Sequence, residues 1–321
     1  MVSIGVDLGY GEVKVVGPNG RLRFPAVWAP YPVTAATWGV GALQPPIVVD
    51  QVPYAVGDDA ATRPGARRPF ADGRLADPDT VPLLAAALWL CGADGDIALG
   101  SGTPLGRFAA ERDAARAALS GREFRLGDGH AARRVRIARL ALRPQGVGAA
   151  VWLAGRGCLP ASPGHAAVVD IGTRTTDVLT LRLANLSPVE ENCFSLDLGA
   201  ATAAESLAAE VQARTGRLPP ADVAAAALRH PVPWGGDAVG GPAAAPHLDA
   251  LAARIRDEVR RRFGGDAGRV VLWAAVGGGA VLLGDRLTGL LPGSQIAMAP
   301  DDAVFANAEG FRDAAARVGA L

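Results

Sequence analysis

A carboxylate followed closely by a glycine is the first feature of this sequence that could support chemistry. Asp170 ends an apolar run of strand length, Gly172 comes two residues later, and a second β-rich run resumes at Thr176. A glycine lets backbone N–H groups approach an anion closely, whereas a carboxylate so near phosphates needs a cation between them. The stretch from Ala166 to Leu183 therefore predicts a β-hairpin whose turn binds a nucleotide together with Mg²⁺.

The N-terminus repeats this arrangement of residues. Superposing Asp7 on Asp170 places Gly9 on Gly172, with an apolar strand before each aspartate and a β-rich run at the same distance after it. The pattern Asp-x-Gly alone is short enough to recur by chance. Its recurrence with strands on both sides predicts two related halves of the chain that face one ligand.

Lys14 is the single lysine among 32 lysine and arginine residues, and it lies in the β-rich run that follows Asp7. Its side chain could return from there toward phosphates at the turn, as a point charge that the planar fork of an arginine does not reproduce. The alternative is a surface lysine that a composition bias toward arginine has left unchanged. Its position in the hairpin favours the phosphate contact.

Two further stretches could face a nucleotide. Gln145 opens a helix expected at 147–153, where its amide could orient a water for attack on a phosphate, although glutamine is also ordinary in a first turn. A glycine run lies between a buried strand expected at 269–276 and a helix from about residue 280, and it would permit close approach of a nucleotide. A glycine run alone is a weak signal.

The elements around these motifs predict an α/β chain. The apolar run 81–92 and the amphipathic runs 248–259 and 301–318 are expected helices. The stretches 53–78 and 231–246 are rich in turn residues, so surface loops of a small subdomain are expected at the first and a mobile loop at the second.

Seven arginines gather between Arg122 and Arg143, around a turn at 127–129 that predicts a β-hairpin. Val135 and Ile137 would face one side of this hairpin, and arginines the other. Such a run usually marks a solvated strand face. A filament contact or an adaptor surface is the alternative.

Composition limits the classes of protein to consider. The chain has 321 residues, 50% of them hydrophobic, which suffices for a large core and favours two domains over one. Its formal net charge of zero gives no overall attraction to nucleic acid or to an anionic membrane, so neither is an expected partner. No apolar run reaches the roughly 18 residues of a membrane span, and the N-terminus enters a strand without a signal peptide. We therefore expect a cytoplasmic protein.

The cysteines and histidines give no sign of a metal site. Cys91, Cys158 and Cys193 are widely spaced within or beside apolar segments, so we expect them to be reduced core residues. The four histidines are scattered along the chain. Neither a histidine metal site nor a histidine-based catalytic set is predicted.

The two hairpins and the glycine run resemble the phosphate-1, phosphate-2 and adenosine motifs of the actin-like ATPase superfamily, in an order and spacing that cover most of the chain. The short length, the lack of an appended substrate-binding domain and the ending Ala-Asn-Ala-Glu-Gly-Phe at 306–311 resemble the prokaryotic ParM and archaeal actin-like group. The resemblance implies two α/β domains, each on a five-stranded ribonuclease-H-like mixed sheet, with Mg-ATP in the cleft. Domain I would hold residues 1–160 and 301–321, and domain II residues 161–300.

The resemblance also implies roles for single residues. Asp7 and Asp170 would hold the hydrated Mg²⁺, Gln145 and Asp170 would be catalytic, and Lys14 would contact phosphate. The residues implied to contact ATP or ADP are Gly9, Tyr10, Gly11, Lys14, Gly172, Thr173, Arg174, Gly277, Gly278 and Gly279.

Thr173 departs from the family pattern, which often reads Asp-x-Gly-Gly-x-Thr at the second hairpin. Because threonine has a branched Cβ that glycine lacks, the departure bears on the local backbone and on the rate of hydrolysis. Arg174, the next residue, could add a phosphate contact or point to solvent.

Three functional classes follow from the resemblance. The first is a cytoskeletal ATPase that assembles head to tail into nucleotide-dependent filaments, in plasmid or DNA segregation or in cell organisation, with a DNA-binding adaptor protein as a possible partner. The second is a small-molecule kinase of the same superfamily, although no convincing catalytic aspartate or sugar pocket is found. The third is a chaperone-type ATPase switch, which the lack of a substrate domain disfavours.

Overall fold

The chain folds into two units. The computed structural model describes residues 1–31 and 45–318, while 32–44 and 319–321, both within predicted domain I, lie outside the described residues. Unit 1 contains Met1–Gly155 and Phe305–Leu321, and unit 2 contains Arg156–Val304. The chain thus passes between the units after residues 155 and 304. The predicted boundaries fall after residues 160 and 300.

Unit 1 is built on one mixed sheet. Its strands among the described residues are β1 (Val2–Leu8), β2 (Glu12–Gly17), β3 (Gly20–Pro25), β4 (Trp28–Pro30), β5 (Ile47–Val49), β6 (Val52–Val56), β7 (Gly95–Thr103), β8 (Glu123–Gly127) and β9 (Ala132–Pro144). Their order is β3-β2-β1-β7-β9-β8-β5-β6-β4, with β1, β7 and β9 parallel. The first five strands in this order form a mixed sheet, as predicted. The predicted number of strands is nevertheless wrong, because β5, β6 and β4 pair onto the β8–β9 hairpin and extend the sheet.

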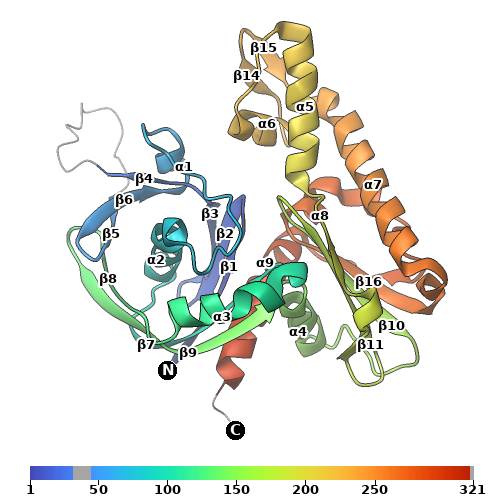
Figure 1. Ribbon diagram of the computed structural model, residues 1–321, viewed down its shortest axis with the longest axis horizontal. Coiled ribbons are helices and arrows are strands. Elements are labelled where there is room, and N and C mark those ends of the chain that lie inside the picture. The colour runs from blue at the N-terminus through green and yellow to red at the C-terminus, as the bar shows by residue number, and fades with distance from the viewer. Residues whose placement is uncertain (32–44, 319–321) are drawn as a thin grey trace. The chain divides into compact units, whose positions relative to one another are not determined.

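The apolar run at 81–92 forms α2 (Val81–Leu90), the central helix of unit 1. Every residue from Pro82 to Leu88 is buried, as expected for a helix that has no polar face. Figure 1 shows the strands of unit 1 curving around this helix. Side chains of α2 share one apolar cluster with residues of β1, β5, β7 and β8. The predicted helix is confirmed, and it is the core on which the sheet closes.

The other helices of this unit are α1 (Gly57–Ala61), α3 (Phe108–Leu119), α4 (Val147–Gly155) and, from Phe305 onward, α9 (Pro300–Arg317). α9 packs on the backbone of the sheet. A Cβ on Gly5 would lie 1.8 Å from the carbonyl oxygen of Ala308, and one on Gly100 would lie 1.9 Å from that of Phe311. Because both positions are glycine, α9 can lie directly on β1 and β7.

The stretch 53–78 is more regular than predicted. It includes most of β6 and all of α1, and Arg74 and Leu75 are each only 5% exposed. Leu75 belongs to the same apolar cluster as α2. The prediction of surface loops is correct for 62–73, where most residues are exposed, and wrong for β6, α1 and residues 74–75, which include buried residues that pack on apolar neighbours.

β8 and β9 form the predicted arginine-rich hairpin, with Ile137 fully buried on its apolar face. On the other face, Arg134 forms an ion pair with Glu123, and Arg136 with Asp96. These four side chains are partly exposed. They agree with the first of the two alternatives, a solvated strand face whose charge is balanced by acidic neighbours.

Unit 2 is also built on one mixed sheet. Its strands among the described residues are β10 (His165–Ile171), β11 (Thr176–Arg182), β12 (Ser187–Pro188), β13 (Phe194–Leu196), β16 (Val270–Val276) and β17 (Ser294–Gln295). The order is β12-β11-β10-β16-β17, with β13 also paired to β11 and with β10, β16 and β17 parallel. The path holds five strands as predicted, and β13 adds a sixth. The hairpin predicted at 166–183 is confirmed as β10 and β11.

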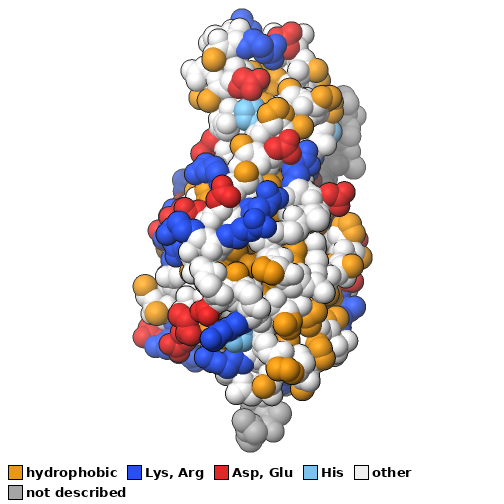
Figure 2. Space-filling model, turned by 90° about the vertical axis from the view of Figure 1, so that its right-hand side faces the viewer, with side chains coloured by type: hydrophobic (Ala, Val, Ile, Leu, Met, Phe, Trp, Pro, Cys, Tyr) orange, Lys and Arg blue, Asp and Glu red, His pale blue; other side chains and the backbone are white. Residues whose placement is uncertain are grey.

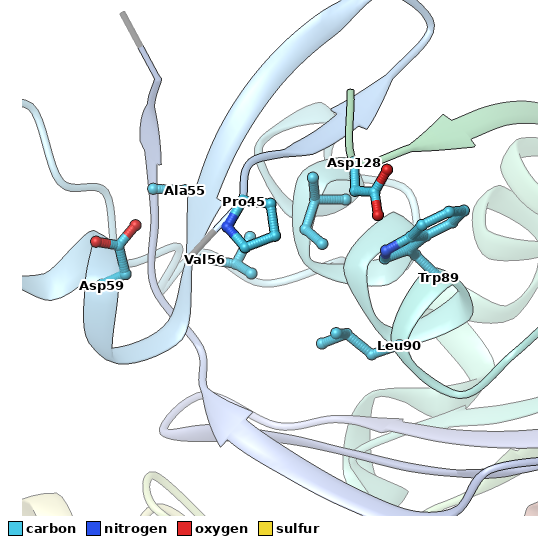
Figure 3. Close-up of a pocket in the computed structure, with 8 residues that line it drawn as sticks. Pro45, Ala55, Val56, Asp59, Trp89, Leu90 and Asp128 are labelled. Carbon is cyan, nitrogen blue, oxygen red and sulfur yellow. The ribbon is translucent and has the colours of Figure 1, made fainter. Parts of the chain in front are cut away.

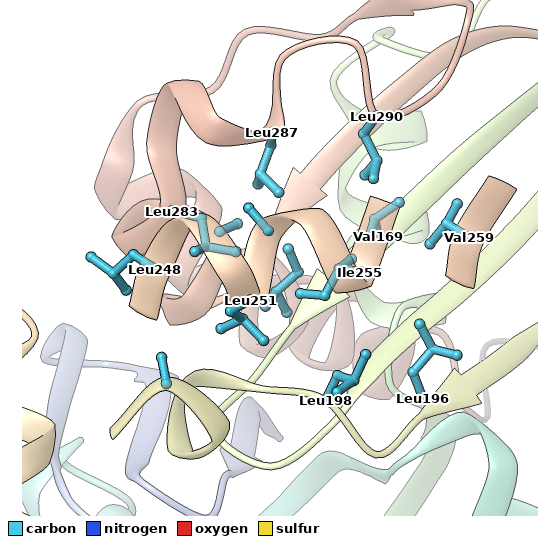
Figure 4. Packing of buried hydrophobic residues seen from close by; sticks show 14 of the residues in the cluster. Val169, Leu196, Leu198, Leu248, Leu251, Ile255, Val259, Leu283, Leu287 and Leu290 are labelled. Atoms are coloured by element: carbon cyan, nitrogen blue, oxygen red, sulfur yellow. The ribbon is translucent and has the colours of Figure 1, made fainter. Parts of the chain in front are cut away.

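The helices of unit 2 are α5 (Ala200–Thr215), α6 (Ala221–Ala227), α7 (Ala245–Phe263) and α8 (Gly278–Leu283). The predicted apolar face of α7 is confirmed. Leu248, Leu251, Ile255 and Val259 of α7 are buried in a cluster that includes Val169 of β10 (Figure 4). This face covers one side of the sheet and fixes the strand that leads to Asp170. Short 3-10 turns complete both units: η1 (Pro78–Thr80), η2 (Leu105–Arg107), η3 (Glu190–Asn192), η4 (Gly241–Ala244), η5 (Gly264–Arg269) and η6 (Gly284–Leu287).

The stretch 231–246, expected as a mobile loop, contains a small hairpin of β14 (Val232–Trp234) and β15 (Asp237–Val239), followed by η4. Val239 and Ala244 are 2% and 1% exposed, and both belong to the core cluster of unit 2. The prediction of an irregular loop is wrong for β14 and β15, and two apolar residues of the stretch anchor it to the core, while its mobility stays a prediction.

The surface carries charges of both signs. On the face drawn in Figure 2, basic and acidic side chains are interspersed rather than separated by sign, in keeping with the net charge of zero. None of the helices in residues 1–31 and 45–318 combines the length and apolar character needed to cross a membrane.

The three cysteines form no disulfide. Cys91 is fully buried, and burial raises the pKa of its thiol to about 12. Cys158 and Cys193 are only half-buried. The reduced state of the cysteines stays a prediction, and the expectation of a core position holds for Cys91 alone.

Candidate functional site

The first hairpin brings a carboxylate and an ammonium group together. Asp7 and Lys14 are cross-strand partners of β1 and β2, and the Nζ of Lys14 lies 3.5 Å from Oδ2 of Asp7. Their side chains are nearly buried. A Cβ on Gly9 would lie 3.3 Å from this Nζ and 2.7 Å from the carbonyl oxygen of Glu12. The side chain of Lys14 thus points back to the turn, as its position in the sequence predicted. A side chain at position 9 would crowd the lysine and collide with the carbonyl oxygen of Glu12, so this position favours glycine.

Gln145 joins this group from the end of β9. Its Nε2 donates a hydrogen bond to Oδ1 of Asp7 at 3.1 Å, and its backbone N–H donates to the carbonyl oxygen of Thr103 at 2.8 Å. The amide nitrogen therefore faces the carboxylate, which leaves the amide oxygen as an acceptor for a water O–H. The structure brings together Asp7, Lys14 and Gln145, as the sequence predicted.

Asn307 of α9 fixes the loop that carries Gln145. Its Oδ1 accepts hydrogen bonds from the backbone N–H groups of Gly146, at 3.0 Å, and Ala149, at 3.1 Å. These groups lie at the start of α4, where helix N–H groups lack partners within the helix. Asn307 is 5% exposed. Sequence reasoning noted this residue in a family pattern but missed its function as a cap supplied by a distant helix.

The side chain of Tyr10 turns to the segment after α1 rather than to a ligand. Its ring packs 4.8 Å from the guanidinium carbon of Arg74 and 5.3 Å from the ring of Phe70, and its hydroxyl lies 3.4 Å from a carboxylate oxygen of Asp72. Only 9% of the surface of Tyr10 is exposed, so its side chain is held by these neighbours. Gly11 follows in the same turn, and its carbonyl oxygen accepts a backbone hydrogen bond from Ala26.

The second hairpin places two carboxylates side by side. Asp170 and Asp177 are cross-strand partners of β10 and β11, so their side chains share one face of the sheet. They are 7% and 1% exposed. The Oγ of Ser195 donates a hydrogen bond to Oδ1 of Asp177. Sequence reasoning missed Asp177, and the available signal was a second aspartate seven residues after the first, in register across a predicted hairpin.

The turn of the second hairpin is tied to the start of α5. Gly172 donates a backbone hydrogen bond to Thr175 at 2.8 Å, and the carbonyl oxygens of Gly172 and Thr173 accept from the first N–H groups of α5 at 3.1 and 2.8 Å. The φ angle of Thr173 is not positive, so the branched Cβ of this residue causes no strain from a left-handed backbone. Arg174 lies half-buried in the same turn.

The glycine run packs against this hairpin from within unit 2. Gly277 has φ +88°, and a Cβ there would lie 2.5 Å from the carbonyl oxygen of Ile171 and 2.6 Å from Oδ1 of Asp170. A Cβ on Gly279 would lie 2.7 Å from the same carbonyl. α8 begins at Gly278, two residues before the predicted position. The glycines therefore bring the start of α8 into contact with the second hairpin at Asp170.

The donor set fits a magnesium nucleotide. No group of three or more His, Cys, Asp or Glu side chains in the described parts of the chain could hold a metal by itself. Each hairpin instead presents a buried carboxylate, Asp7 or Asp170, next to a glycine turn. Mg²⁺ is typically bound through one or two carboxylates, with water and phosphate oxygens as its other ligands. The chemistry of each carboxylate, taken by itself, therefore fits a Mg²⁺ ion that also has water and phosphate ligands.

Unit 1 also contains a small apolar pocket, which Figure 3 shows with Trp89 and Pro45 in its wall. Its volume is about 110 Å³, and it is lined by Pro45, Ile47, Ala55, Val56, Asp59, Trp89, Leu90 and Asp128. None of the predicted site residues lines it. Ligand pockets usually measure about 300–1,000 Å³, so this one is too small for a nucleotide.

Comparison with known proteins adds two family profiles. Residues 5–148 match the profile described as "Actin like proteins N terminal domain". Residues 168–289 match the profile described as "Archaeal actin homologue MreB-like, C-terminal". The first match contains the first hairpin and Gln145, and the second contains the second hairpin and the glycine run.

Two curated relatives are similar over nearly the whole chain. The archaeal actin homologues of Thermoplasma acidophilum and Thermoplasma volcanium are each 43% identical over 328 residues, with 99% of this chain and 99% of each relative covered.

Solved structures show the same fold. A crystal structure of an archaeal actin homologue in complex with ADP is 41% identical, with a TM-score of 0.86 over 99% of this chain and all of that one. A non-polymerisable ParM mutant is 20% identical, with a TM-score of 0.82 over 97% of this chain and 98% of its own. The whole-chain match to the curated relatives is the stronger evidence for the family, and the ParM likeness supports the fold alone. The chain therefore belongs to the actin-like proteins, in the group of archaeal actin homologues.

Proposed function

We propose that this protein binds ATP and ADP with Mg²⁺, hydrolyses ATP, and assembles into filaments under control of the bound nucleotide. The observation that carries the proposal is the cluster of Asp7, Lys14 and Gln145 at the first hairpin turn. A lysine, a carboxylate and a water-orienting amide at a glycine turn are the groups that phosphoryl transfer requires. An archaeal actin homologue that is 41% identical over the whole chain was solved with ADP.

The residues of the first hairpin have separate tasks in this proposal. Lys14 supplies a positive charge to the phosphates, and the backbone N–H groups of Gly9, Tyr10 and Gly11 donate to their oxygens. Asp7 would accept hydrogen bonds from the water ligands of Mg²⁺, and the metal would supply positive charge that neutralises the phosphates. Gln145, held on Asp7 by its amide nitrogen, accepts a hydrogen bond from the attacking water through its amide oxygen.

The residues of the second hairpin contribute to the same nucleotide. Asp170 is proposed as the second carboxylate toward the hydrated metal, with Gly172, Thr173 and Arg174 on the phosphates. Gly277, Gly278 and Gly279 are proposed to lie along the nucleoside. Their close packing on Asp170 supports this assignment, because one ligand can then contact both features of unit 2.

Assembly is proposed as head-to-tail polymerisation of the chain with itself. A contact between two different surfaces of one subunit is heterologous and open-ended, so it generates a filament. The proposed roles are cell organisation or DNA segregation, with a DNA-binding adaptor as a candidate partner in the second case. The cytoplasmic location stays a prediction.

Nucleotide binding is tested first, by calorimetric titration of Mg-ATP and Mg-ADP into the full-length protein. Lys14→Ala should weaken affinity about 10- to 100-fold, because a charge-assisted contact to phosphate is lost. Arg116→Ala is the matched control, since Arg116 is an exposed cation on α3 outside the site. Equal affinity of the Lys14 variant and the wild type would contradict the phosphate contact and leave Lys14 with its ion pair to Asp7 alone.

Assembly and turnover are tested by sedimentation, light scattering and phosphate release at increasing protein concentration. Filaments should form above a critical concentration with Mg-ATP or a slowly hydrolysed analogue, and they should loosen after hydrolysis. A protein that stays monomeric with every nucleotide across salt and temperature, while a sugar or another hydroxyl compound stimulates hydrolysis, would instead be a kinase of the same superfamily.

A further inference from the structure

Arg74 lies against the backbone of the first hairpin turn, although it comes from the segment between α1 and α2. Its Nε donates a hydrogen bond to the carbonyl oxygen of Leu8, and its Nη2 donates to that of Gly9, both at 2.9 Å. Its Nη1 donates to the carbonyl oxygen of Pro69. The guanidinium thus uses all three of its nitrogens on backbone carbonyls, of which one ends β1 and one begins the turn.

The charge of Arg74 is retained despite its burial. The residue is 5% exposed, and desolvation lowers the pKa of the guanidinium to about 10. At neutral pH it is therefore protonated. The ring of Tyr10 lies 4.8 Å from its central carbon, in the geometry of a cation–π contact. A second positive charge thus stands at the turn in addition to Lys14.

The two hydrogen bonds to Leu8 and Gly9 fix two peptide planes. In a trans peptide the carbonyl oxygen of one residue and the N–H of the next lie in one plane and point in opposite directions. Holding the oxygen of Leu8 therefore sets the direction of the Gly9 N–H, and holding that of Gly9 sets the direction of the Tyr10 N–H. Both N–H groups are directed away from Arg74.

The segment that carries Arg74 is itself firmly held. The N–H of Gly73 donates to Oε1 of Glu111 on α3 at 3.0 Å, and Asp72 forms an ion pair with Arg107. Thr80, at the start of α2, donates its hydroxyl to the carbonyl oxygen of Arg74. Since α2 and α3 support the segment on both sides, the guanidinium is a fixed point for the turn.

We propose that Arg74 is a positioning residue for phosphate binding, which holds the Gly9 and Tyr10 N–H groups in the direction of the nucleotide phosphates. This inference rests on the proposed function and adds a residue that lies outside all three nucleotide motifs. A lysine at position 74 would keep the charge but would lack the planar fork that reaches several carbonyls at once. Positioning therefore depends on arginine in particular.

The test compares the affinities of Arg74→Lys, Arg74→Gln and the wild type for Mg-ATP and for adenosine, each by competition calorimetry. Both variants should bind Mg-ATP about 10- to 100-fold more weakly, since hydrogen bonds to a charged ligand depend on aligned donors. Adenosine lacks phosphates, so its affinity should change less than about threefold. A general loss of folded protein would reduce both affinities by one common factor, so the ratio separates positioning from stability.

Arg63→Lys is the matched control. Arg63 is a partly buried arginine of the same unit that also stacks on a tyrosine, Tyr31, at 4.4 Å, but its hydrogen bonds go to Asp59. It should leave both affinities unchanged. Amide hydrogen exchange without nucleotide gives a second readout: the peptide covering 8–12 should exchange faster in the Arg74 variants, and the peptide covering 170–176 should not.

The outcomes separate this inference from the proposed function. Wild-type Mg-ATP affinity in both Arg74 variants, or an equal loss for ATP and adenosine, would overturn the positioning role and leave the proposed function intact. A wild-type protein that binds no nucleotide would overturn the proposed function as well. Slower binding of ATP without a change in the affinity ratio would also count against positioning.

Discussion

The two hairpins share a pattern in sequence but are supported differently in space. At the first, Asp7 stands beside a cation, Lys14, and beside the amide of Gln145, and the turn is held from behind by a guanidinium. At the second, Asp170 stands beside another carboxylate, Asp177, and the turn is held by backbone contacts with α5 and the glycine run.

This difference shows how one local motif can serve two tasks. Side chains that carry charge surround the first turn, so its affinity for phosphate and its water-orienting amide can be changed one residue at a time. Two carboxylates on one face concentrate negative charge at the second hairpin, which supports the proposed role of Asp170 toward the hydrated metal. In the proposed function, the first hairpin therefore supplies the ammonium group for phosphate and the amide for the attacking water, whereas turnover depends on the metal chiefly through Asp170 of the second hairpin.

The largest expected effect separates these two tasks. Asp170→Ala should reduce Mg²⁺-dependent ATP turnover about 10³-fold, because a preorganised group toward the metal is lost. Gln145→Ala should slow hydrolysis about 10²-fold, since only the orientation of water is lost. Nucleotide affinity should stay within about twofold of the wild type in the Gln145 variant. Single-turnover kinetics and titration calorimetry measure the two effects.

The control for this pair is the dependence of turnover on Mg²⁺ concentration. Half-saturation should shift to higher Mg²⁺ in Asp170→Ala and stay unchanged in Gln145→Ala. Equal losses of nucleotide binding in both variants would contradict the division of tasks between the hairpins.

Much of each hairpin could be predicted because its information is local. Apolar runs on both sides of Asp7 and Asp170 gave the strands, and the spacing from Asp7 to Lys14 gave the return of the ammonium to the turn. Such cross-strand pairs can be predicted because every second side chain of a strand lies on the same face of the sheet. Asp177 could have been found by the same rule.

The supports of the first hairpin could not be predicted because they join distant residues. Arg74 is 66 residues from Leu8, and Asn307 is 161 residues from Gly146. Nothing in the local sequence of either residue marks its partner. The added strands β5 and β6 were missed for a related reason, since turn residues between them hid their pairing with a hairpin far along the chain.

A smaller effect should follow from adding one methyl group to the support of the second hairpin. Gly277→Ala should destabilise unit 2 by about 2–4 kcal/mol, because φ is +88° and the new Cβ would meet two oxygen atoms within 2.6 Å. Gly236→Ala is the control, with φ +95° and nothing within 4 Å of the new Cβ. Gly236→Ala should therefore lower the free energy of unfolding only by the cost of a positive φ for alanine, about 1–2 kcal/mol.

Urea unfolding of the two variants measures the difference in their free energies of unfolding. Hydrogen exchange within β10 and β11 shows whether the loss of stability reaches the second hairpin. The two glycine variants isolate steric contact from backbone conformation within one unit. Equal stability of the two would mean that the glycine run relaxes away from Asp170, and that the second hairpin depends less on backbone packing than the comparison with the first suggests.

The smallest expected effect tests whether the two hairpins serve one nucleotide. If both contribute to the same Mg-ADP, opening either hairpin must release part of the ligand, so the ligand stabilises both against opening. At a free Mg-ADP concentration ten times the Kd, exchange of protected amides in peptides covering 2–17 and 165–182 should slow by up to about tenfold. Amides of β14 and β15, which carry none of the site residues, should keep their rates. Protection confined to one hairpin would show that the other does not contact this nucleotide, and the symmetry of the two motifs in sequence would then reflect a shared fold rather than a shared ligand.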